Sequence, residues 1–332
     1  MKTINLGVIG LGRIGMVHLE NLLFRVSEAK VLSAFDPNKD KCDFAKQTGV
    51  PKITNSVKDL IQDESVQAVA ICSPTTTHVE ILEMAIAAGK HIFCEKPLDL
   101  SIEKIKRIKQ LAEDKAVKLQ VGFNRRFDAN FRQIRRQVED GIIGDPHILR
   151  ITSRDPAPPP IEFVSTSGGL FMDMSIHDFD MARFIVGSEV TEVYAKAAVR
   201  IDEAIGEAGD VDTAAIQLQF ENGCMGLIDN SRQSGYGYDQ RLEIFGSNGM
   251  AKIGNNFPDT TMVYNKDGRY GPQPVHFFME RYIEAYREEM KSFVNTVAKN
   301  KDVEVSADDA LAATKIALAC QESIRTKLPV YL

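Results

Sequence analysis

A chain of 332 residues is long enough for two domains, each with a hydrophobic core of its own. Its net charge of −6, without a long run of basic residues, argues against nucleic acid or an anionic membrane as a partner. The five cysteines are scattered and include no C-x-x-C pair, which argues against a disulfide framework or a cysteine-bound zinc. No apolar run reaches the roughly 18 residues that span a bilayer. The first strand leaves no room for a signal peptide, so a cytoplasmic protein is expected.

The first predicted element is a strand that begins near Ile4 and ends in a G-x-G-x-x-G pattern before a helix. In a dinucleotide fold Gly10 permits the tight turn, Gly12 leaves room for a pyrophosphate, and Gly15 lets the helix pack on the strand. Asp36 follows a second strand, 21 residues after Gly15, where a carboxylate can accept the adenosine ribose hydroxyls. This pattern predicts NAD as the cofactor. The alternative is a glycine-rich turn with an ordinary surface aspartate.

Up to residue 122 the chain alternates strands and helices. The expected elements are helices over 38–48, 79–88 and 101–115 and strands over 66–73, 91–94 and 117–122. Thr77 and Glu80 form a possible capping box for the second of these helices. The alternation predicts a doubly wound parallel sheet, which binds ligands at the carboxyl ends of its strands, where Asp36, Pro74 and Lys96 fall.

The second half of the sequence favours a separate α+β domain. The expected elements are helices over 129–139, 168–186, 280–298 and from 306, and strands over 147–153, 190–201, 213–221, 224–230, 241–245, 250–253 and 261–264. Tight-turn signals at Asn222–Gly223, Asn248–Gly249 and Asp267–Gly268 predict a large, mostly antiparallel open sheet. We therefore expect an NAD-binding Rossmann domain over 1–122 and a substrate-binding and oligomerisation domain over 123–332.

Two groups of residues could do chemistry. Lys96 follows a strand and precedes a proline, and its charge could orient a hydroxyl and ease its deprotonation; the alternative is a surface lysine on a loop. Asp173 and His177 are four apart and share one face of a helix, so the imidazole could take a proton while the carboxylate steadies the resulting cation. A metal is a rival interpretation, but no third and fourth ligands are evident. The remaining interpretation is structural: an aspartate that the helix dipole favours near the N-terminus, and a histidine on the polar face of the helix.

Several other polar residues are weaker candidates. Arg125 and Arg126 could reach a cleft or form an exposed interdomain pair. Tyr236 and Tyr238 could line a polar pocket or pack at an interface. Asp155 could accept hydrogen bonds from a polyol or only cap a turn.

Four motifs together resemble the glucose–fructose oxidoreductase/inositol dehydrogenase (Gfo/Idh/MocA) family over essentially the whole chain. They are the N-terminal G-x-G-x-x-G, Glu95-Lys96-Pro97, the GFNRRF segment at 122–127, and the helix bearing Asp173 and His177. Residues 154–160 (RDPAPPP) and 168–183 (GGLFMDMSIHDFDMAR) are similar to the myo-inositol 2-dehydrogenase branch. The resemblance implies NAD-linked oxidation of myo-inositol to 2-keto-myo-inositol (scyllo-inosose), a role in inositol catabolism, and a homotetramer assembled through the open faces of the C-terminal sheets.

The resemblance also implies roles for individual residues. Lys96, Asp173 and His177 match the catalytic trio, with His177 as the acid/base. The implied cofactor positions are Gly10, Gly12, Arg13, Ile14, Gly15, Asp36, Ser73, Pro74, His78, Glu95 and Lys96. The implied substrate contacts are Lys96, Arg126, Asp155, Asp173, His177 and Tyr236, with no metal.

Two alternatives stay open. Arg13 and Lys39 would suit the 2′-phosphate of NADP, but Asp36 would repel it, so NAD is favoured. The substrate could be scyllo-inositol or a related pyranose sugar, and a non-catalytic NAD- or sugar-binding regulator of the same fold is the alternative to an enzyme.

Overall fold

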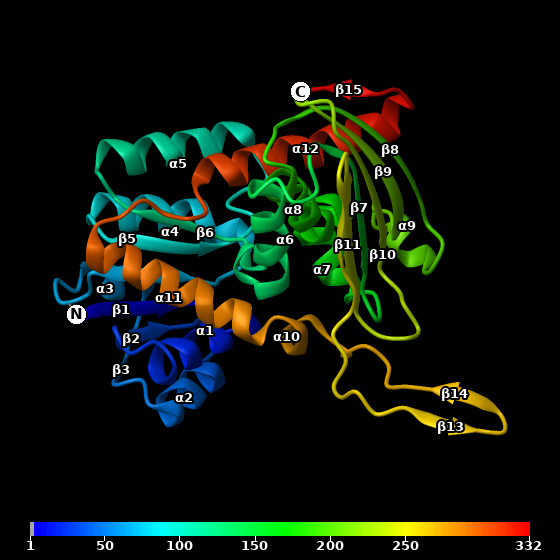
Figure 1. Ribbon diagram of the computed structural model, residues 1–332. Coiled ribbons are helices and arrows are strands. Elements are labelled where there is room, and N and C mark those ends of the chain that lie inside the picture. The colour runs from blue at the N-terminus through cyan, green and yellow to red at the C-terminus, as the bar shows by residue number, and fades with distance from the viewer. Residues whose placement is uncertain (1–2) are drawn as a thin grey trace. The chain divides into compact units, whose positions relative to one another are not determined.

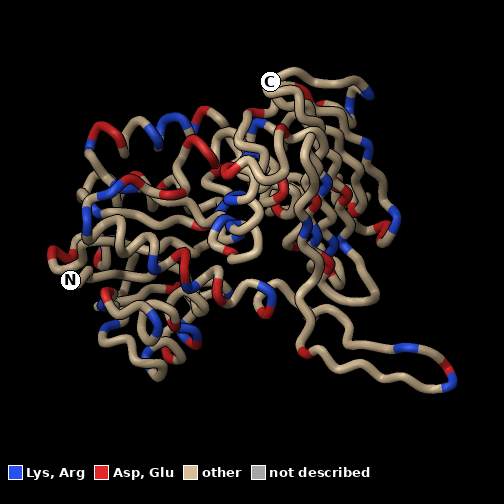
Figure 2. The backbone as a smooth tube through the Cα atoms, in the orientation of Figure 1, with Lys and Arg blue, Asp and Glu red and all other residues tan. Residues whose placement is uncertain are grey.

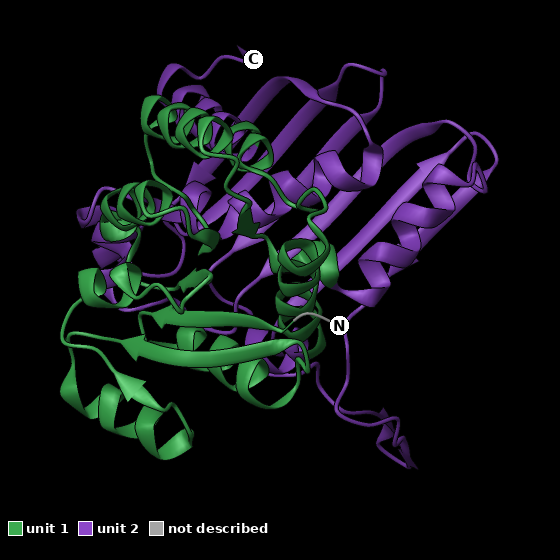
Figure 3. Ribbon diagram, turned by 90° about the vertical axis from the view of Figure 1, so that its left-hand side faces the viewer, with its two compact units in different colours: residues 1–127, 284–312 green, residues 128–283, 313–332 purple. Residues whose placement is uncertain are grey.

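The chain forms two compact units in the computed structural model, which describes residues 3–332 (Figures 1 and 3). Unit 1 consists of the chain up to Phe127 together with Glu284–Ala312, and unit 2 consists of Asp128–Ile283 and Ala313–Leu332. The expected division placed everything after residue 122 in the second domain. The structure differs because 284–312 return to the first unit.

Unit 1 is built on a parallel sheet of six strands. The strands are β1 (Ile4–Ile9), β2 (Ala29–Phe35), β3 (Lys52–Ile53), β4 (Ala68–Ile71), β5 (His91–Glu95) and β6 (Leu119–Gly122). Their order is β3-β2-β1-β4-β5-β6, with every neighbouring pair parallel. The strand order reverses between β1 and β4, and ligands bind at such switch points in open α/β sheets. The predicted doubly wound sheet is confirmed.

Helices flank this sheet. They are α1 (Arg13–Phe24), α2 (Lys39–Thr48), α3 (Val57–Gln62), α4 (Thr75–Ala87), α5 (Ile102–Asp114) and α11 (Ile283–Lys299), with a 3₁₀ turn, η1 (Asn124–Phe127). Residues Met290, Phe293 and Val294 of α11 share one buried core with Leu19 and Phe93. Because these apolar side chains recur on one helix face, α11 packs with unit 1 although it lies far along the sequence.

The first turn of α4 corrects the expected capping box. This helix begins at Thr75, with Pro74 at the N-cap and no side-chain cap. The Thr77 hydroxyl instead donates to the Pro74 carbonyl oxygen at 2.8 Å. A proline has the fixed φ that suits the start of a helix, so α4 starts earlier than the spacing of Thr77 and Glu80 indicated.

Unit 2 is built on a mixed, mostly antiparallel sheet of seven strands. They are β7 (Pro146–Arg154), β8 (Val190–Ala198), β9 (Thr213–Phe220), β10 (Met225–Ser231), β11 (Asp239–Gly246), β12 (Gly249–Ile253) and β15 (Val330–Tyr331). Their order is β12-β11-β7-β10-β9-β8-β15, and only β7 and β10 run parallel. The expected α+β architecture is confirmed, and β15 was not foreseen.

The helices of unit 2 complete its architecture. They are α6 (Ala129–Glu139), α7 (Ile161–Ser167), α8 (Ile176–Val186), α9 (Glu203–Glu207), α10 (Phe278–Arg281) and α12 (Ala307–Thr326), whose first residues belong to unit 1. The helix expected over 168–186 is present from residue 169, with a π-helical turn, η2 (Phe171–Ser175), before α8. A small hairpin of β13 (Val263–Asn265) and β14 (Gly268–Tyr270) projects from the sheet (Figure 1).

One face of this sheet carries a row of apolar side chains. Met225 of β10 pairs with Ile148 of β7, Ile148 with Phe245 of β11, and Phe245 with Met250 of β12. Paired residues point to the same face, and three of the four side chains, those of Met225, Phe245 and Met250, are 43%, 45% and 50% exposed. The alternate residues of these strands, such as Leu149 and Ile244, are buried on the opposite face.

The charge pattern is mixed throughout. Figure 2 shows Lys and Arg interspersed with Asp and Glu along both units over residues 3–332. Within the same residues, no helix is long and apolar enough to cross a membrane.

Candidate functional site

The glycine loop shows which glycines the fold itself requires. Gly10 has a φ of +89°, and a Cβ there would lie 2.6 Å from the carbonyl carbon of Cys72. A Cβ at Gly15 would overlap the carbonyl oxygen of Gly10. A Cβ at Gly12 would meet no described atom within 4 Å. The turn therefore needs Gly10 and Gly15 for packing, whereas Gly12 keeps space open at the start of α1, where a phosphate group fits.

Asp36 joins the glycine loop to the end of β2. Its Oδ2 accepts a hydrogen bond from the Leu11 N–H at 2.7 Å, and its Oδ1 accepts one from the Asn38 N–H at 2.9 Å. Lys41 approaches Oδ2 at 3.8 Å. A carboxylate can accept about four hydrogen bonds, so two backbone donors leave capacity for ribose hydroxyls.

The loop after β4 is tied to the loop after β5. The Ser73 and Thr77 hydroxyl oxygens lie 2.7 Å apart. His78 is buried, and its Nε2 and Nδ1 lie 2.9 Å from the carbonyl oxygens of Ser73 and Pro97 respectively. Burial lowers the pKa of His78. Because both ring nitrogens face carbonyl oxygens of the chain, His78 connects the two loops, with its polar atoms turned inward.

The Glu95-Lys96-Pro97 motif begins at the last residue of β5. The Glu95 carboxylate is 2.6 Å from His18 Nε2, a contact that the sequence did not reveal. Lys96 is half-buried and is joined to Pro97 by a cis peptide bond. Arg126, a predicted substrate contact, donates from Nη2 to Asp309 Oδ1 at 2.8 Å.

In unit 2, Asp173 lies in the π-helical turn η2 and His177 lies in the first turn of α8. Arg232 donates from Nη1 to Asp173 Oδ2 at 3.1 Å, and its Nη2 lies 3.6 Å from Asp210 Oδ2. The Arg232 side chain is only 1% exposed. Sequence reasoning missed this arginine, because a single arginine after a strand carries no motif signal.

Asn230, near the end of β10, makes hydrogen bonds to the same helical segment. Its Oδ1 accepts a hydrogen bond from the Ser175 hydroxyl at 2.6 Å, and its Nδ2 donates to Asp178 Oδ2 at 2.8 Å. All three residues are buried. These bonds orient the segment that carries Asp173 and His177.

Tyr236 belongs to a second polar network in unit 2. Its hydroxyl donates to Asp239 Oδ2 at 2.6 Å and accepts from Arg154 Nη1 at 3.1 Å. Burial would raise the pKa of Asp239, but hydrogen bonds from Arg241, Tyr236 and other donors outweigh it and hold the pKa below its usual range. Asp155 is half-buried, and its N–H donates to the Ser231 carbonyl oxygen at 2.9 Å.

Tyr238, named with Tyr236 in the sequence, does not share its environment. It is buried, and its ring packs edge-on against Tyr282 at 6.1 Å between centroids. The interpretation of Tyr238 as an aromatic packing residue is the one that the structure supports.

The predicted site residues therefore divide between the units. Lys96, Arg126 and the cofactor positions belong to unit 1, and Asp155, Asp173, His177 and Tyr236 belong to unit 2.

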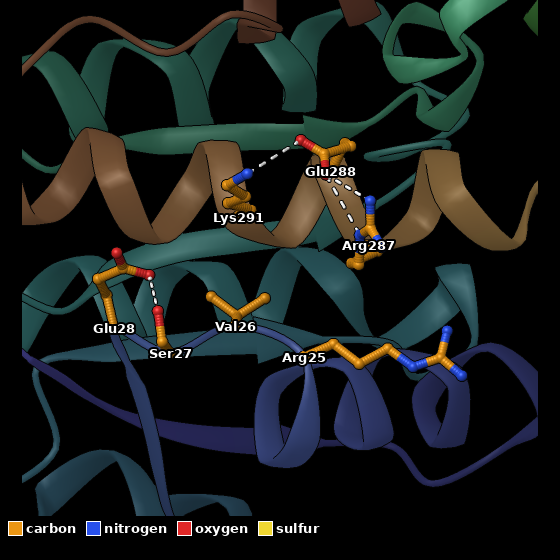
Figure 4. A pocket seen from close by; sticks show the side chains of 7 residues that line it. All are labelled: Arg25, Val26, Ser27, Glu28, Arg287, Glu288 and Lys291. Carbon is orange, nitrogen blue, oxygen red and sulfur yellow. Dashed lines mark hydrogen bonds and ion pairs between the residues drawn. The ribbon is translucent and has the colours of Figure 1, made fainter.

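A surface hollow in unit 1 is separate from the glycine loop. It has a volume of about 420 Å³. Its lining residues are Arg25, Val26, Ser27, Glu28, Arg287, Glu288 and Lys291 (Figure 4). It adjoins the C-terminal end of α1, and a helix of 12 residues is about 18 Å long, so the hollow is distant from Gly12. It is not the dinucleotide site.

Comparison with known proteins agrees with the two units. Residues 4–123 match an oxidoreductase family with an NAD-binding Rossmann fold, and residues 131–252 match the GFO/IDH/MocA C-terminal domain. The chain is 45% identical to the myo-inositol 2-dehydrogenase of Thermotoga maritima over 328 residues, which cover 98% of each protein. It is 42% identical to the inositol 2-dehydrogenase of Rhizobium meliloti over 327 residues, again 98% of each.

A solved structure carries the same fold together with a cofactor. The scyllo-inositol dehydrogenase from Lactobacillus casei, crystallised with NAD(H) and scyllo-inositol, superimposes with a TM-score of 0.93 at 37% identity over 99% of each chain. The glycine loop, Asp36 and these matches make unit 1 an NAD-binding domain. The chain belongs to the GFO/IDH/MocA family of oxidoreductases.

Proposed function

We propose that the chain oxidises the 2-hydroxyl of myo-inositol to 2-keto-myo-inositol (scyllo-inosose), with NAD as the hydride acceptor. The observation that carries the proposal is the Asp173–His177 segment, braced by the buried Arg232, in a chain that also has Lys96 at the end of β5. The 45% identity to a protein named myo-inositol 2-dehydrogenase supports the substrate.

The cofactor positions follow from the glycine loop. Gly12 leaves the space that a pyrophosphate needs, the N-terminus of α1 presents the positive end of the helix dipole, and Asp36 has acceptor capacity for the ribose hydroxyls. The loops at Ser73–Pro74 and Glu95–Lys96 follow β4 and β5, at the carboxyl edge of the same sheet. When bound, NAD supplies the nicotinamide ring that accepts the hydride.

The chain's own residues manage the hydroxyl proton. His177 takes the proton as a general base, and Lys96 stabilises the developing alkoxide by its charge. Asp173 steadies the imidazolium that forms, and Arg232 keeps Asp173 oriented. The carbon gives up a hydride and the oxygen gives up a proton, so the products are the ketone, NADH and one proton.

A second candidate substrate is scyllo-inositol. The relative crystallised with scyllo-inositol is 37% identical, and a Bacillus subtilis relative named scyllo-inositol 2-dehydrogenase (NAD(+)) is 36% identical. The two isomers differ at one ring hydroxyl, so the same proton-transfer groups serve both. The higher identities to proteins named for myo-inositol or inositol favour the first candidate.

Initial rates of NADH formation test the proposal. Purified protein is assayed with NAD and with NADP against myo-inositol, scyllo-inositol and glucose at mildly alkaline pH, which favours a reaction that releases a proton. We expect the highest kcat/KM for NAD with myo-inositol. A higher value with scyllo-inositol would reassign the substrate, and no rate with any polyol despite NAD binding would favour a non-catalytic regulator.

Replacing Lys96 separates catalysis from binding. Lys96→Ala should lower kcat by about 100- to 1,000-fold, the range for loss of a group that stabilises a developing negative charge, while NAD affinity stays near that of the wild type. Lys106→Ala, an exposed lysine on α5, is the matched control and should leave kcat unchanged. An unchanged rate for Lys96→Ala would refute the catalytic assignment.

We also propose a homotetramer that covers the open face of the seven-stranded sheet. The apolar row of Met225, Ile148, Phe245 and Met250 would be buried against another copy of the chain. Light scattering should give four times the chain mass of 36.9 kDa. Phe245→Glu should lower the mass, whereas Phe24→Glu, at an exposed position of α1, should not. A monomeric wild type would refute the assembly.

A further inference from the structure

A polar cluster lies inside the apolar core of unit 1. His18 of α1, Glu95 of β5 and Glu289 of α11 place a ring nitrogen and carboxylate oxygens within 4.8 Å of one another. His18 and Glu289 are completely buried, and the Glu95 side chain is 16% exposed. Gln120 of β6 adjoins them, because its Nε2 donates to the Glu289 carbonyl oxygen at 3.2 Å. Four elements of one unit thus meet at this cluster.

The Glu95 carboxylate is held in one position. His18 Nε2 donates to its Oε1 at 2.6 Å. A Cβ at Gly122 would lie 2.9 Å from its Oε2, so glycine at 122 gives the carboxylate room in this position. Glu95 immediately precedes Lys96, and His18 lies on the helix that the glycine loop begins. The hydrogen bond between His18 and Glu95 therefore connects α1, the helix after the glycine loop, to the backbone next to Lys96.

Glu289 has no such partners. Neither carboxylate oxygen has a hydrogen-bond partner among the described residues, and Glu95 is the charged group that acts on Glu289. Burial, and then the charge of Glu95, raise the pKa of Glu289 well above its usual range. A buried carboxylate without a cation or a donor is costly, so the group keeps its proton.

The other titratable groups around Glu289 add no positive charge. Burial raises the pKa of the Cys72 thiol well above its usual range, so this group stays neutral. Tyr286, one turn earlier on α11, packs edge-on against the His18 ring at 5.6 Å between centroids. His18 Nδ1 has no hydrogen-bond partner among the described residues, so the bond to Glu95 is made by Nε2.

The distances favour hydrogen bonding over a metal ion. Ligand atoms about 2.0–2.1 Å from a tetrahedral ion such as zinc stand roughly 3.3 Å apart. The 2.6 Å between His18 Nε2 and Glu95 Oε1 is shorter than that separation and suits a charge-assisted hydrogen bond.

We propose that His18 and Glu289 are positioning residues for the proposed dehydrogenase reaction. Glu289 is a neutral acid whose O–H faces the Glu95 carboxylate, and His18 holds the other side of that carboxylate. Together they fix the backbone next to Lys96. The inference rests on the proposed role of Lys96 as a catalytic residue, but the neutral state of Glu289 can be measured without turnover.

The first measurement is the infrared spectrum near neutral pH. The wild type should show the carbonyl band of a buried protonated carboxylic acid, and Glu289→Gln should lose it. Glu284→Gln, at a residue of the same helix whose side chain is 65% exposed, is the matched control and should keep the band. Equal spectra for the wild type and Glu289→Gln would overturn the neutral acid.

The second measurement is kcat against pH with myo-inositol and NAD. Glu289→Gln keeps the shape and the neutral charge, so its kcat should persist to higher pH than that of the wild type, in which Glu289 ionises. Glu289→Leu and His18→Leu should lower kcat about tenfold to a hundredfold with little change in the KM for NAD, because Lys96 is displaced. His18→Gln, which retains an N–H donor, should recover most of this loss.

The outcomes separate the two proposals. A wild type that binds NAD but turns over no polyol would refute the proposed function, and the infrared band would still decide the state of Glu289. An active wild type whose pH profile matches that of Glu289→Gln would overturn the positioning role alone. A stoichiometric metal in the purified protein, measured by plasma mass spectrometry, would also overturn it, because the cluster would then be a ligand set.

Discussion

Glu289 in unit 1 and Asp239 in unit 2 are both completely buried acids, yet their surroundings are opposite. Asp239 accepts hydrogen bonds from Arg241, from the Tyr236 hydroxyl at 2.6 Å and from Asn255 Nδ2 at 2.7 Å. Glu289 accepts none from the described residues. The pKa of Asp239 is therefore lowered and that of Glu289 is raised.

The two shifts give opposite dependences of stability on pH. Asp239 stabilises the fold above the ordinary carboxyl pKa of about 3.9, and this contribution is lost as the pH falls through its lowered folded-state pKa. Glu289 gives stability the opposite dependence on pH. Above about 4.3 the unfolded chain releases this proton while the folded chain keeps it, so the free energy of unfolding falls as pH rises.

The difference teaches how each unit positions its polar groups. Unit 1 uses tight backbone turns, as at Gly10, and a cluster in which His18 bonds Glu95 while Glu289 has no hydrogen-bond partner among the described residues. Unit 2 uses ion pairs, with Arg232 beside Asp173 and Arg241 beside Asp239. The Asp173 carboxylate, beside the proposed proton-transfer group His177, has a buried cation to hold it.

The largest effect is expected at the buried cation of unit 2. Arg232→Met leaves Asp173 and Asp210 without their shared guanidinium and should lower the free energy of unfolding by about 3–5 kcal/mol. Urea unfolding at neutral pH measures it. Arg200→Met, at an exposed arginine of the same unit, should change stability little. If both variants change the free energy of unfolding equally, the buried ion pairs of Arg232 do not distinguish unit 2 from unit 1.

A smaller effect is expected at Asp239. Asp239→Asn weakens the charge-assisted bonds to Arg241 and Tyr236 and should cost about 1.5–3 kcal/mol at neutral pH. The cost should shrink as the pH falls, since the wild-type carboxylate is then protonated. Asp267→Asn, in an exposed turn, is the control for urea unfolding across pH. A cost independent of pH would mean that the charge of Asp239 contributes nothing.

The glycine loop separates stability from cofactor binding. Gly10→Ala forces a side chain into a positive φ and against backbone atoms, and should destabilise unit 1 by at least about 1–3 kcal/mol. Gly12→Ala should leave thermal stability near the wild type but weaken NAD binding, measured by calorimetry. If Gly12→Ala binds NAD with unchanged affinity, the phosphates of NAD do not bind at this loop.

The remaining effect is the pH dependence of Glu289→Gln. Relative to the wild type, this variant should gain stability as the pH rises above about 4.3, by at most about 1.4 kcal/mol per pH unit. Urea unfolding from pH 5 to pH 9 measures the difference, with Glu284→Gln as control. A constant difference across this range would show that Glu289 is ionised in the folded chain.

Much of the fold could be read from short stretches of sequence. The three glycines before a helix, the acid after the second strand and the alternation of strands and helices all predicted the parallel sheet that the structure contains. Ser101, where the predicted helix over 101–115 begins, is the N-cap of α5, and its hydroxyl accepts from the Lys104 N–H. These features are local, because a turn or a cap depends on residues within a few positions of one another.

The return of α11 to unit 1 could not be read in this way. An amphipathic helix reveals that it has an apolar face but not which core that face joins. The capping box predicted at Thr77 is a second difference, because the helix begins earlier, after Pro74. Both differences arise where two locally acceptable solutions exist and packing selects one.

By itself, then, the sequence determined the glycine loop, the acid at Asp36, and the spacing that places Asp173 and His177 in one helical segment. Only the tertiary structure decided what holds these groups. His18 reaches Glu95 across 77 residues, Arg232 reaches Asp173 across 59, and Gln120 reaches Glu289 across 169. The charge state of a buried side chain depends on the neighbours and the dielectric around it, and those exist only once distant segments have packed together.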